Sequence, residues 1–553
     1  MWFNVILFMT IVSTYVQGDA ERIVKLRQGR VRGHLDPNGG LYSFYGIPYA
    51  TAPTGIHKFK APLPGPAWID TLDAVDNRTV CPQKDFMGLM PESLFDIKED
   101  CLVANIFVPA TKETNLSVVI YVHGGAFVIG YGNWLSYKAL VRSKKVIVVT
   151  FNYRLGAHGF LCLGTDDVPG NAGMKDQVAL LRWVNQNIAN FGGNPEEVTI
   201  AGYSAGSVSV DLLMLSKSTK GLFKKIIPES GASLAAFSIQ TDPFENAKEF
   251  ARLLNYTGSN SIPSLEDFFK NVSYETLTSI NVLARFDSTF LMSPCIERSN
   301  SGDAFLTDSP INIIKHGLYP KIPTLYGFTS MEGLVRLPLF DQFKDAMNKN
   351  FQDFLPPDLK FQNDEERQAV AQKVKEFYFG NSNIDSDTIL EYINYFSDII
   401  FTYPALRTVK YHVEAGHDQI YLYEYSFVHD DLPKIPYTNI RGADHCSQTY
   451  IVSDGLNATM NNDRLEEMKP IIRTIWANFI FTGKPIPEDS ELPPWPPVGK
   501  NWSPHMSIDL PLSLRGSLLK ERTLFWDQIY ERHYQRRFSI RLVFFLMYVH
   551  QLR

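Results

Sequence analysis

The sequence predicts an α/β protein with a large, mostly parallel central sheet flanked by helices. Short runs rich in β-branched and aromatic residues alternate with longer segments of helical periodicity. That alternation is typical of parallel strands joined by crossover helices, which cover both faces of the sheet. The strand-like runs are SVVIYV from residue 117, KVIVVTF from 145, EVTIA from 197, IPTLYG from 322 and QIYLYEYSF from 419.

One crossover helix can be placed between two of these runs. In the segment KDQVALLRWVNQNIANFGG, Val178, Leu181, Val184 and Ile188 recur on one helical stripe. Two glycines at 192–193 end the helix before the next strand-like run. This segment therefore predicts one β-α-β unit.

Composition is that of a globular enzyme with one large domain. The chain has 553 residues, 45% hydrophobic and 20% charged, with a formal net charge of -6, and it is long enough to bury a large core. It contains no Pro/Ser/Gly-rich linker, internal repeat or low-complexity segment. No block of Lys and Arg is present, so neither nucleic acid nor an anionic membrane surface is an expected partner.

The two ends of the chain carry apolar segments outside the expected domain. An apolar stretch from Val5 to Val12 precedes small residues at Val16 and Gly18, which predicts a signal peptide over residues 1–18 and secretion. A buried N-terminal strand is the alternative, and the missing basic residue before the apolar run favours it. The C-terminal run LVFFLMYV at 542–549 is too short to span a bilayer. It either packs on the protein surface or makes a weak membrane contact.

Glycosylation motifs and cysteines agree with an extracellular protein. Five cysteines permit at most two disulfides and leave one thiol over, and spacing alone does not determine the pairing. The Asn-x-Ser/Thr candidates for glycosylation are Asn77, Asn115, Asn255, Asn271, Asn457 and Asn501.

The segment GYSAG, residues 202–206, has the pattern of a nucleophile elbow. Ser204 lies between Gly202 and Gly206, where a strand-like run changes to a helical pattern. A side chain at either glycine would collide with the neighbouring strand or helix, so the pattern has a steric cause. A sharp strand-to-helix turn exposes a serine hydroxyl to a base, which makes Ser204 the candidate nucleophile.

A second glycine-rich loop can supply the donors that an oxyanion needs. HGGAF, which begins at 123, follows a strand-like run, and its amides at Gly124, Gly125 and Ala126 can be joined by the amide of Ala205. Seen alone, HGG is typical of a simple tight turn. Beside a nucleophile elbow it indicates an oxyanion hole, because ligands gather at the carboxyl ends of parallel strands.

Together these motifs resemble the type-B carboxylesterase and cholinesterase family of α/β-hydrolases, over residues 22–534, with 535–553 as a C-terminal extension. The secreted insect members, moth antennal esterases included, are the most similar in appearance. The matching segments are FYGIPYATAPTG from 44, EDCLVANIFVP from 99, NYRLGAHGF from 152, the GNAGMKDQVALL region from 170 to GYSAGS, SDIIFTYP from 397 and WANFIFTGKP from 476.

The resemblance implies a catalytic triad in the chain order Ser, Glu, His. The matching positions are Ser204, Glu332 in GFTSMEG and His445 in GADH. His445 would take the serine proton and return it to the departing alcohol, while Glu332 would hold the imidazole. The resemblance also pairs Cys81 with Cys101. We then expect the other three thiols to be free and buried: Cys162, Cys295 and Cys446.

Several positions depart from the family pattern. Cholinesterases have Glu before the nucleophile where this chain has Tyr203, and the loop between Cys81 and Cys101 lacks their choline-binding Trp. An acetylcholine substrate is therefore not expected. Ala126 replaces the usual third glycine. HCSQTY, from His445, replaces the usual acidic pair, which predicts a shifted register for the following helix.

These observations predict a secreted serine carboxylesterase that hydrolyses small neutral esters through an acyl-enzyme. A non-catalytic ligand-binding or adhesion protein of the same fold is the alternative, and within enzymes the alternatives are a juvenile-hormone, odorant or pheromone esterase. No phosphate-binding loop and no metal-ligand spacing appears, so no cofactor and no metal are expected. An aromatic group is expected to be mostly helix packing, with a gorge lining as the alternative: Phe377, Tyr378, Phe379, Tyr392, Tyr395, Phe396, Phe401 and Tyr403.

Overall fold

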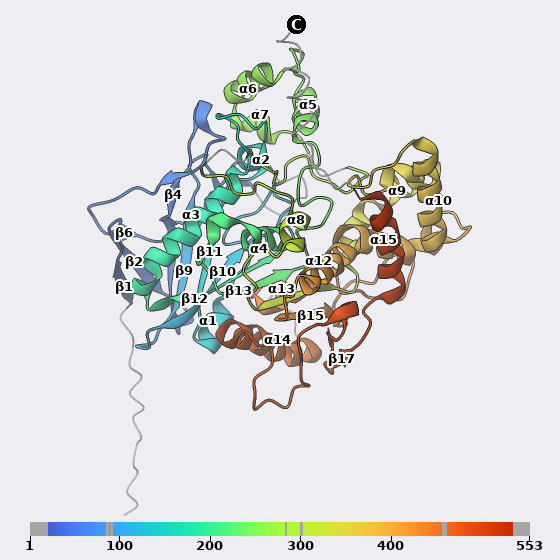
Figure 1. The fold of residues 1–553 in the computed structure, drawn as a ribbon. Helices are drawn as coiled ribbons and strands as arrows, with labels where there is room; N and C mark the ends of the chain where they lie inside the picture. Colours follow the sequence, from blue (N-terminus) through green and yellow to red (C-terminus); the bar gives the residue numbers. More distant parts are fainter. Residues whose placement is uncertain are drawn as a thin grey trace, which may run out of the picture.

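The structure is a computed structural model, and it describes residues 20–84, 88, 92–281, 285–298, 302–455 and 462–534. The predicted signal peptide, the extension from 535 onward and Asn457 lie outside these residues. The architecture is a long twisted sheet with helices against both faces (Figure 1).

One 13-stranded sheet organises the molecule. Its order is β1-β2-β3-β9-β11-β10-β12-β13-β14-β15-β16-β17, with β6 beside β2. The strands are β1 (Glu21–Lys25), β2 (Arg30–Leu35), β3 (Leu41–Pro48), β6 (Leu72–Asp73), β9 (Val103–Pro109), β10 (Leu116–Val122), β11 (Ile147–Phe151), β12 (Gly193–Tyr203), β13 (Lys225–Glu229), β14 (Thr324–Thr329), β15 (Ile420–Tyr425), β16 (His505–Ile508) and β17 (Ser513–Arg515). Two small pairs stand apart: β4 (Ala50–Thr51) with β5 (Leu63–Pro64), and β7 (Thr79–Val80) with β8 (Asp96–Ile97).

The centre of the sheet is parallel, as predicted, and its edges are antiparallel. Strands β11, β10, β12, β13, β14, β15 and β16 run parallel to one another. All five strand-like runs of the sequence lie in this region. The antiparallel strands β1, β2, β3, β9 and β17 were not predicted, nor were β6, β13 and β16. The sequence of β13, KIIPE, contains a proline and two charged residues that mask its complete burial.

The helices are α1 (Lys138–Lys144), α2 (Gly156–Phe160), α3 (Ala172–Asn187), α4 (Ala205–Leu215), α5 (Pro243–Leu253), α6 (Ile262–Asn271), α7 (Tyr274–Thr278), α8 (Pro310–Lys315), α9 (Phe340–Lys349), α10 (Asp364–Phe379), α11 (Ile389–Ser397), α12 (Tyr403–Glu414), α13 (Ser447–Val452), α14 (Asp463–Thr482) and α15 (Lys520–His533). A π-helical segment, Asp398–Thr402 (η8), joins α11 to α12. Helix α3 is the predicted crossover, connecting β11 to β12 on the far side of β10.

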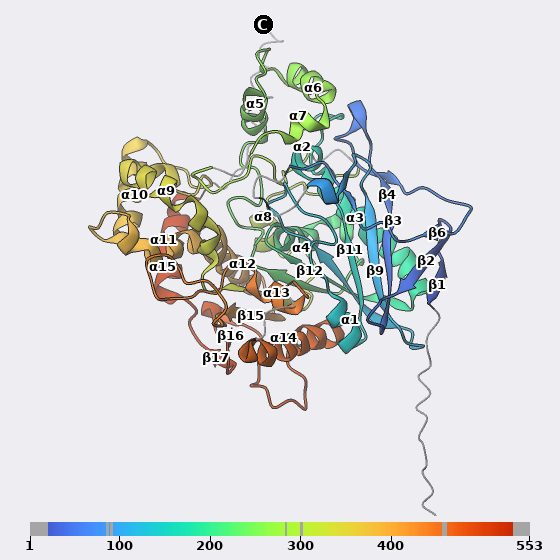
Figure 2. The same cartoon turned by 180° about the vertical axis from the view of Figure 1, so that it is seen from behind.

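Alternation along β10 shows how the two faces of the sheet are covered. Val118, Ile120 and Val122 pack in the cluster that includes α3 and α4, whereas Val119 and Tyr121 pack in the cluster that includes α1 and α14. Beyond these layers, α5, α6 and α7 lie together at one end of the molecule. Helices α9, α10, α11 and α15 group at another side, as both views show (Figures 1 and 2).

The cysteines correct one expectation and agree with another. Cys81 and Cys101 form the disulfide that the family resemblance implied. Cys162 and Cys295 were expected to be free, but they form a second disulfide. The fold brings these two residues, 133 positions apart, to a Cα–Cα distance of 6.7 Å. Only Cys446 has a free thiol, and it is buried.

Candidate active site

Ser204 occupies a strained turn between β12 and α4. Its φ is 57° and its ψ is -124°, a conformation that an L-residue adopts only when its surroundings force it. A Cβ at Gly202 would collide with the carbonyl oxygen of Gly206, and a Cβ at Gly206 would collide with that of Val122. The Ser204 amide donates to the carbonyl oxygen of Glu229 at 2.9 Å. The two glycines therefore permit the turn, and the main chain of β13 holds it.

Glu332 and His445 are in direct contact. Glu332 is the first residue after the turn that follows β14, and it is completely buried. One of its carboxylate oxygens hydrogen-bonds Nδ1 of His445, and the other accepts from the Thr329 amide at 2.8 Å. A histidine held through Nδ1 presents Nε2 as the base.

An aromatic ring covers the imidazole. The Phe401 ring stacks on His445 with a centroid distance of 4.2 Å and an interplanar angle of 30°. Phe401 is buried within the π-helical segment η8, and it also meets Phe237 at 5.9 Å. Such π-helical insertions in longer helices occur frequently at functional sites. Phe401 therefore shields one face of the imidazole from water.

Most of the remaining aromatic group packs between helices, in agreement with the sequence-based expectation. Tyr392 of α11 and Phe340 of α9 have ring centroids 4.9 Å apart, and Tyr378 of α10 and Tyr395 of α11 have ring centroids 5.4 Å apart. Within this group, only Phe401 has a ring contact with a candidate catalytic residue.

The HGGAF loop lies beside the nucleophile turn. A Cβ at Gly124 would be 3.0 Å from the Ser204 Cβ, which places the loop against the serine. Gly125 has a φ of 104°, and a side chain there would collide with the carbonyl of Ile129. Ala126 has a φ of 54°, a region that favours glycine. Its methyl group is therefore carried in a strained conformation. Ala205 follows Ser204 at the start of α4, where helix N-terminal amides point outward.

Three residues that the sequence analysis did not single out support this loop. Gln83 donates to the Gly130 carbonyl at 3.0 Å and accepts from the Gly130 amide at 2.8 Å, so the first disulfide loop is tied to the HGGAF loop. His123 stacks on Tyr153, whose hydroxyl donates to the His123 carbonyl. Burial lowers the pKa of His123 to about 4, so this ring is neutral.

The altered segment after His445 forms an anchored helix. Cys446 has a φ of 65° and α13 begins at Ser447. Gln448 Nε2 donates to Ser230 Oγ at 3.0 Å, and Thr449 Oγ1 donates to Glu229 Oε2 at 2.7 Å. Polar partners on β13 and the residue after it therefore hold this helix.

An apolar pocket borders the loop at its far end. Its lining includes Val128 and Ile129, which follow HGGAF, together with Ala157, Leu277 and Met292. The pocket has a volume of only about 40 Å³, and its lining includes none of the three candidate catalytic residues.

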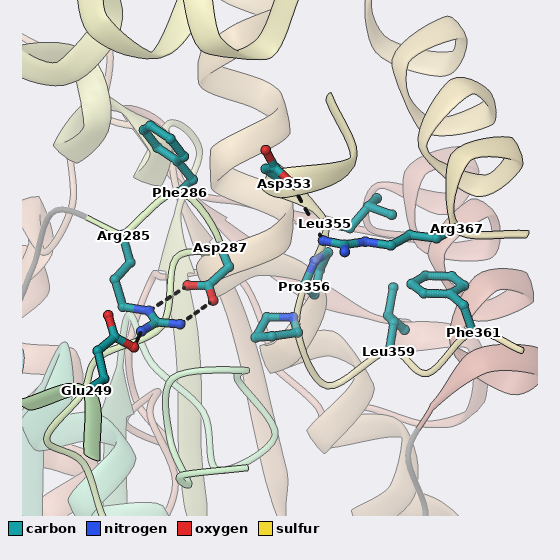
Figure 3. Close-up of a pocket in the computed structure, with 11 residues that line it drawn as sticks. Glu249, Arg285, Phe286, Asp287, Asp353, Leu355, Pro356, Leu359, Phe361 and Arg367 are labelled. Carbon is teal, nitrogen blue, oxygen red and sulfur yellow. Dashed lines mark hydrogen bonds and ion pairs between the residues drawn. The ribbon is translucent and has the colours of Figure 1, made fainter. Parts of the chain in front are cut away.

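A separate hollow of about 540 Å³ contains no residue of the candidate site (Figure 3). In it Arg285 binds Glu249 and Asp287, and Arg367 faces Asp353 at 3.9 Å. These charges are already paired, so the hollow offers no free charge to a ligand.

The described residues contain no group of three or more His, Cys, Asp or Glu side chains arranged to hold a metal ion. They also contain no helix long and apolar enough to cross a membrane.

The chain is similar to known esterases over most of its length. The model of the Carboxylesterase family matches residues 20–526. A carboxylic ester hydrolase of Bombus ignitus is 32% identical over 87% of this chain and 89% of its own length. A juvenile hormone esterase of Heliothis virescens is 33% identical over 86% and 88%. The crystal structure of juvenile hormone esterase from Manduca sexta, with OTFP covalently attached, superposes with a TM-score of 0.82 at 30% identity, over 92% of this chain and all of that one.

The parallel sheet, the nucleophile turn and the Glu–His pair are thus accompanied by similarity across nearly the full length of the chain. The protein belongs to the carboxylesterase family and is a serine carboxylic ester hydrolase with the α/β-hydrolase fold.

Proposed function

We propose that Ser204, His445 and Glu332 form the catalytic triad. The observation that carries this proposal is the Glu332–His445 pair, assembled from two loops that follow the adjacent parallel strands β14 and β15. These strands lie in the same sheet as β12, which ends at the strained Ser204 turn and is separated from β14 by β13 alone. The amides of Gly124, Gly125, Ala126 and Ala205 are the candidates for the oxyanion hole.

In the first half-reaction, Ser204 Oγ attacks the ester carbonyl while its proton passes to Nε2 of His445. The carbonyl oxygen gains charge beside the loop amides. The bond to the alkoxy oxygen then breaks, and the imidazolium gives its proton to the departing alcohol. Water repeats these steps on the acyl-enzyme and releases the acid. Glu332 keeps the imidazole oriented and stabilises its charged form.

The first test is hydrolysis of p-nitrophenyl esters, from acetate to long acyl chains, by the wild type and by Ser204→Ala. Loss of the nucleophile should lower kcat by about 10⁴-fold or more. A folded wild type without turnover would favour the ligand-binding alternative. The acyl-length optimum would show which size of acyl group the site takes.

We further propose that residues 1–18 direct secretion, that 22–534 form the catalytic domain and that 535–553 are an extension. Two disulfides suit an oxidising compartment. Five candidate glycosylation sites are exposed: Asn77, Asn115, Asn255, Asn271 and Asn501. Expression of the full chain in insect cells should give enzyme in the medium that begins at Asp19 and loses mass with a glycosidase. Retention inside the cell would contradict this proposal.

For the natural substrate we propose a class: a small neutral ester with an apolar part. The juvenile hormone esterases among the relatives make a hormone ester one candidate, beside odorant and pheromone esters. Comparing kcat/KM for a methyl ester of a long apolar acid with that for a short acetate ester of a long alcohol would separate these candidates.

A further inference from the structure

Glu229, a carboxyl group with no role in the proposed mechanism, contacts both halves of the candidate site. It is the last residue of β13, and none of its surface is exposed. Its main-chain oxygen accepts from the Ser204 amide at 2.9 Å. The end of β13 therefore holds the nucleophile turn in place.

The side chain of the same residue reaches the helix that follows the base. Glu229 Oε2 accepts from Thr449 Oγ1 at 2.7 Å, and Thr449 lies four residues after His445 in α13. Glu229 Oε1 faces Trp476 Nε1 of α14 at 3.4 Å. The next residue, Ser230, receives a second hydrogen bond from α13, donated by Gln448 at 3.0 Å. One strand end thus holds Ser204 through its main chain and the His445 segment through side chains.

Several ionisable groups among the described residues interact electrostatically with Glu229, and none of them carries a positive charge. Those groups are the phenols of Tyr121 on β10, Tyr137 before α1 and Tyr423 on β15, and the thiol of Cys446. Burial raises the pKa of Glu229 to about 8, while the Thr449 and Trp476 hydrogen bonds act in the opposite direction. The carboxyl group is therefore protonated at neutral pH.

We propose that Glu229 is a positioning residue for ester hydrolysis, which sets the place of His445 relative to Ser204 through its hydrogen bond with Thr449. The inference rests on the proposed roles of Ser204 and His445. Ionisation of Glu229 places an unpaired charge in the interior behind both residues. Activity should then decline as the pH rises past about 8, for a reason that lies outside the triad.

The test uses one deletion of the hydrogen bond, its rescue and a matched control. Thr449→Val removes the donor at constant shape and should lower kcat by about 10²-fold with little change in KM, since small misplacements of a catalytic group have effects of this size. Thr449→Ser restores the hydroxyl and should recover most of kcat. The control is Thr199→Val, another completely buried threonine, whose hydroxyl makes no hydrogen bond within the described residues and whose replacement should leave kcat unchanged.

A pH profile separates positioning from a purely structural role. Glu229→Gln keeps an oxygen acceptor for Thr449 but cannot ionise, so its activity should hold to higher pH than that of the wild type. Equal kcat in Thr449→Val and wild type, or identical alkaline limbs in Glu229→Gln and wild type, would overturn the inference. If Glu229→Gln does not fold, the Thr449 pair still decides.

The same experiment distinguishes this inference from the proposed function. Thr449→Val should still release one equivalent of p-nitrophenol in a slow burst as Ser204 is acylated, whereas Ser204→Ala should release none. An active wild type with an unaffected Thr449→Val overturns the positioning role alone. An inactive wild type overturns the proposed function and this inference with it.

Discussion

The Ser204 turn depends on two glycines next to it in the chain and on one main-chain hydrogen bond with β13, whereas His445 is positioned by side chains from three distant segments. Gly202 and Gly206 make the serine turn possible by leaving space for the neighbouring carbonyl groups. His445 depends on the carboxylate of Glu332, the ring of Phe401 and the α13 anchor on β13. The nucleophile turn thus depends largely on local sterics, and the placement of the base depends on tertiary contacts, so the two should respond differently to mutation.

The largest effect on kcat should come from breaking the hydrogen bond between Glu332 and His445. Glu332→Gln replaces the carboxylate with an amide that fixes the wrong imidazole tautomer and cannot stabilise the imidazolium, so kcat should drop by about 10⁴-fold. Stopped-flow measurement of acylation will check this. A reduction of less than about tenfold would contradict the role of Glu332.

Gly206→Ala tests whether the Ser204 turn depends on the space that the neighbouring glycine leaves. Its Cβ meets the carbonyl of Val122, so either the turn shifts or the strand does. The overpacking should cost about 1–3 kcal/mol of stability, with loss of most activity. Thermal unfolding and kcat should be measured together, with Ala205→Gly as the partner variant that removes a methyl group next to the same serine. A fully active, equally stable Gly206→Ala would refute the steric account.

Phe401→Leu should have a smaller effect on the base. An imidazolium over an aromatic face gains about 0.5–2 kcal/mol, so kcat should decrease by about 2-fold to 30-fold. Phe396→Leu, in the same aromatic cluster but without ring contact to His445, is the matched control. Equal kcat in the two variants would argue against stacking on His445 as the cause.

The smallest expected effect is on stability against pH. Glu229 ionises near 4.5 when exposed, but burial raises its pKa to about 8, so the folded state binds an additional proton between these values. Stability therefore decreases as the pH rises through this window, and above about 8 the full destabilisation by Glu229 persists but no longer changes with pH. The Tm of Glu229→Gln relative to the wild type should rise by a few degrees between pH 5 and 8. Parallel Tm curves would show that Glu229 does not hold its proton.

Much of the site could be predicted because short motifs carry a steric cause. GYSAG and HGGAF require glycines at close main-chain contacts, and these contacts occur at the predicted positions. The five strand-like runs were recognisable by their β-branched composition. Strand β13 was missed because a proline and two charged residues conceal its burial, yet it supports both Ser204 and the His445 segment.

The pairing of the cysteines could not be predicted either, because it depends on contacts between segments far apart in the chain. Nothing in the spacing of Cys162 and Cys295 indicates that they meet, because the path between them includes α3 to α7 and the strands β12 and β13. The HCSQTY segment also departs from the family pattern, but its partners Glu229 and Ser230 lie on a strand end that no local pattern connects with it.

The sequence by itself determined most of the parallel core of the fold and the glycines of the nucleophile turn and of the HGGAF loop, since these depend on local periodicity and sterics, whereas the order of the candidate triad is implied by the resemblance to the family. Only the tertiary structure decided which cysteines pair, what covers and orients His445, and that a buried, protonated Glu229 contacts both halves of the site. Those features depend on distances between segments far apart in the chain, and such distances are set by the packing of the whole sheet.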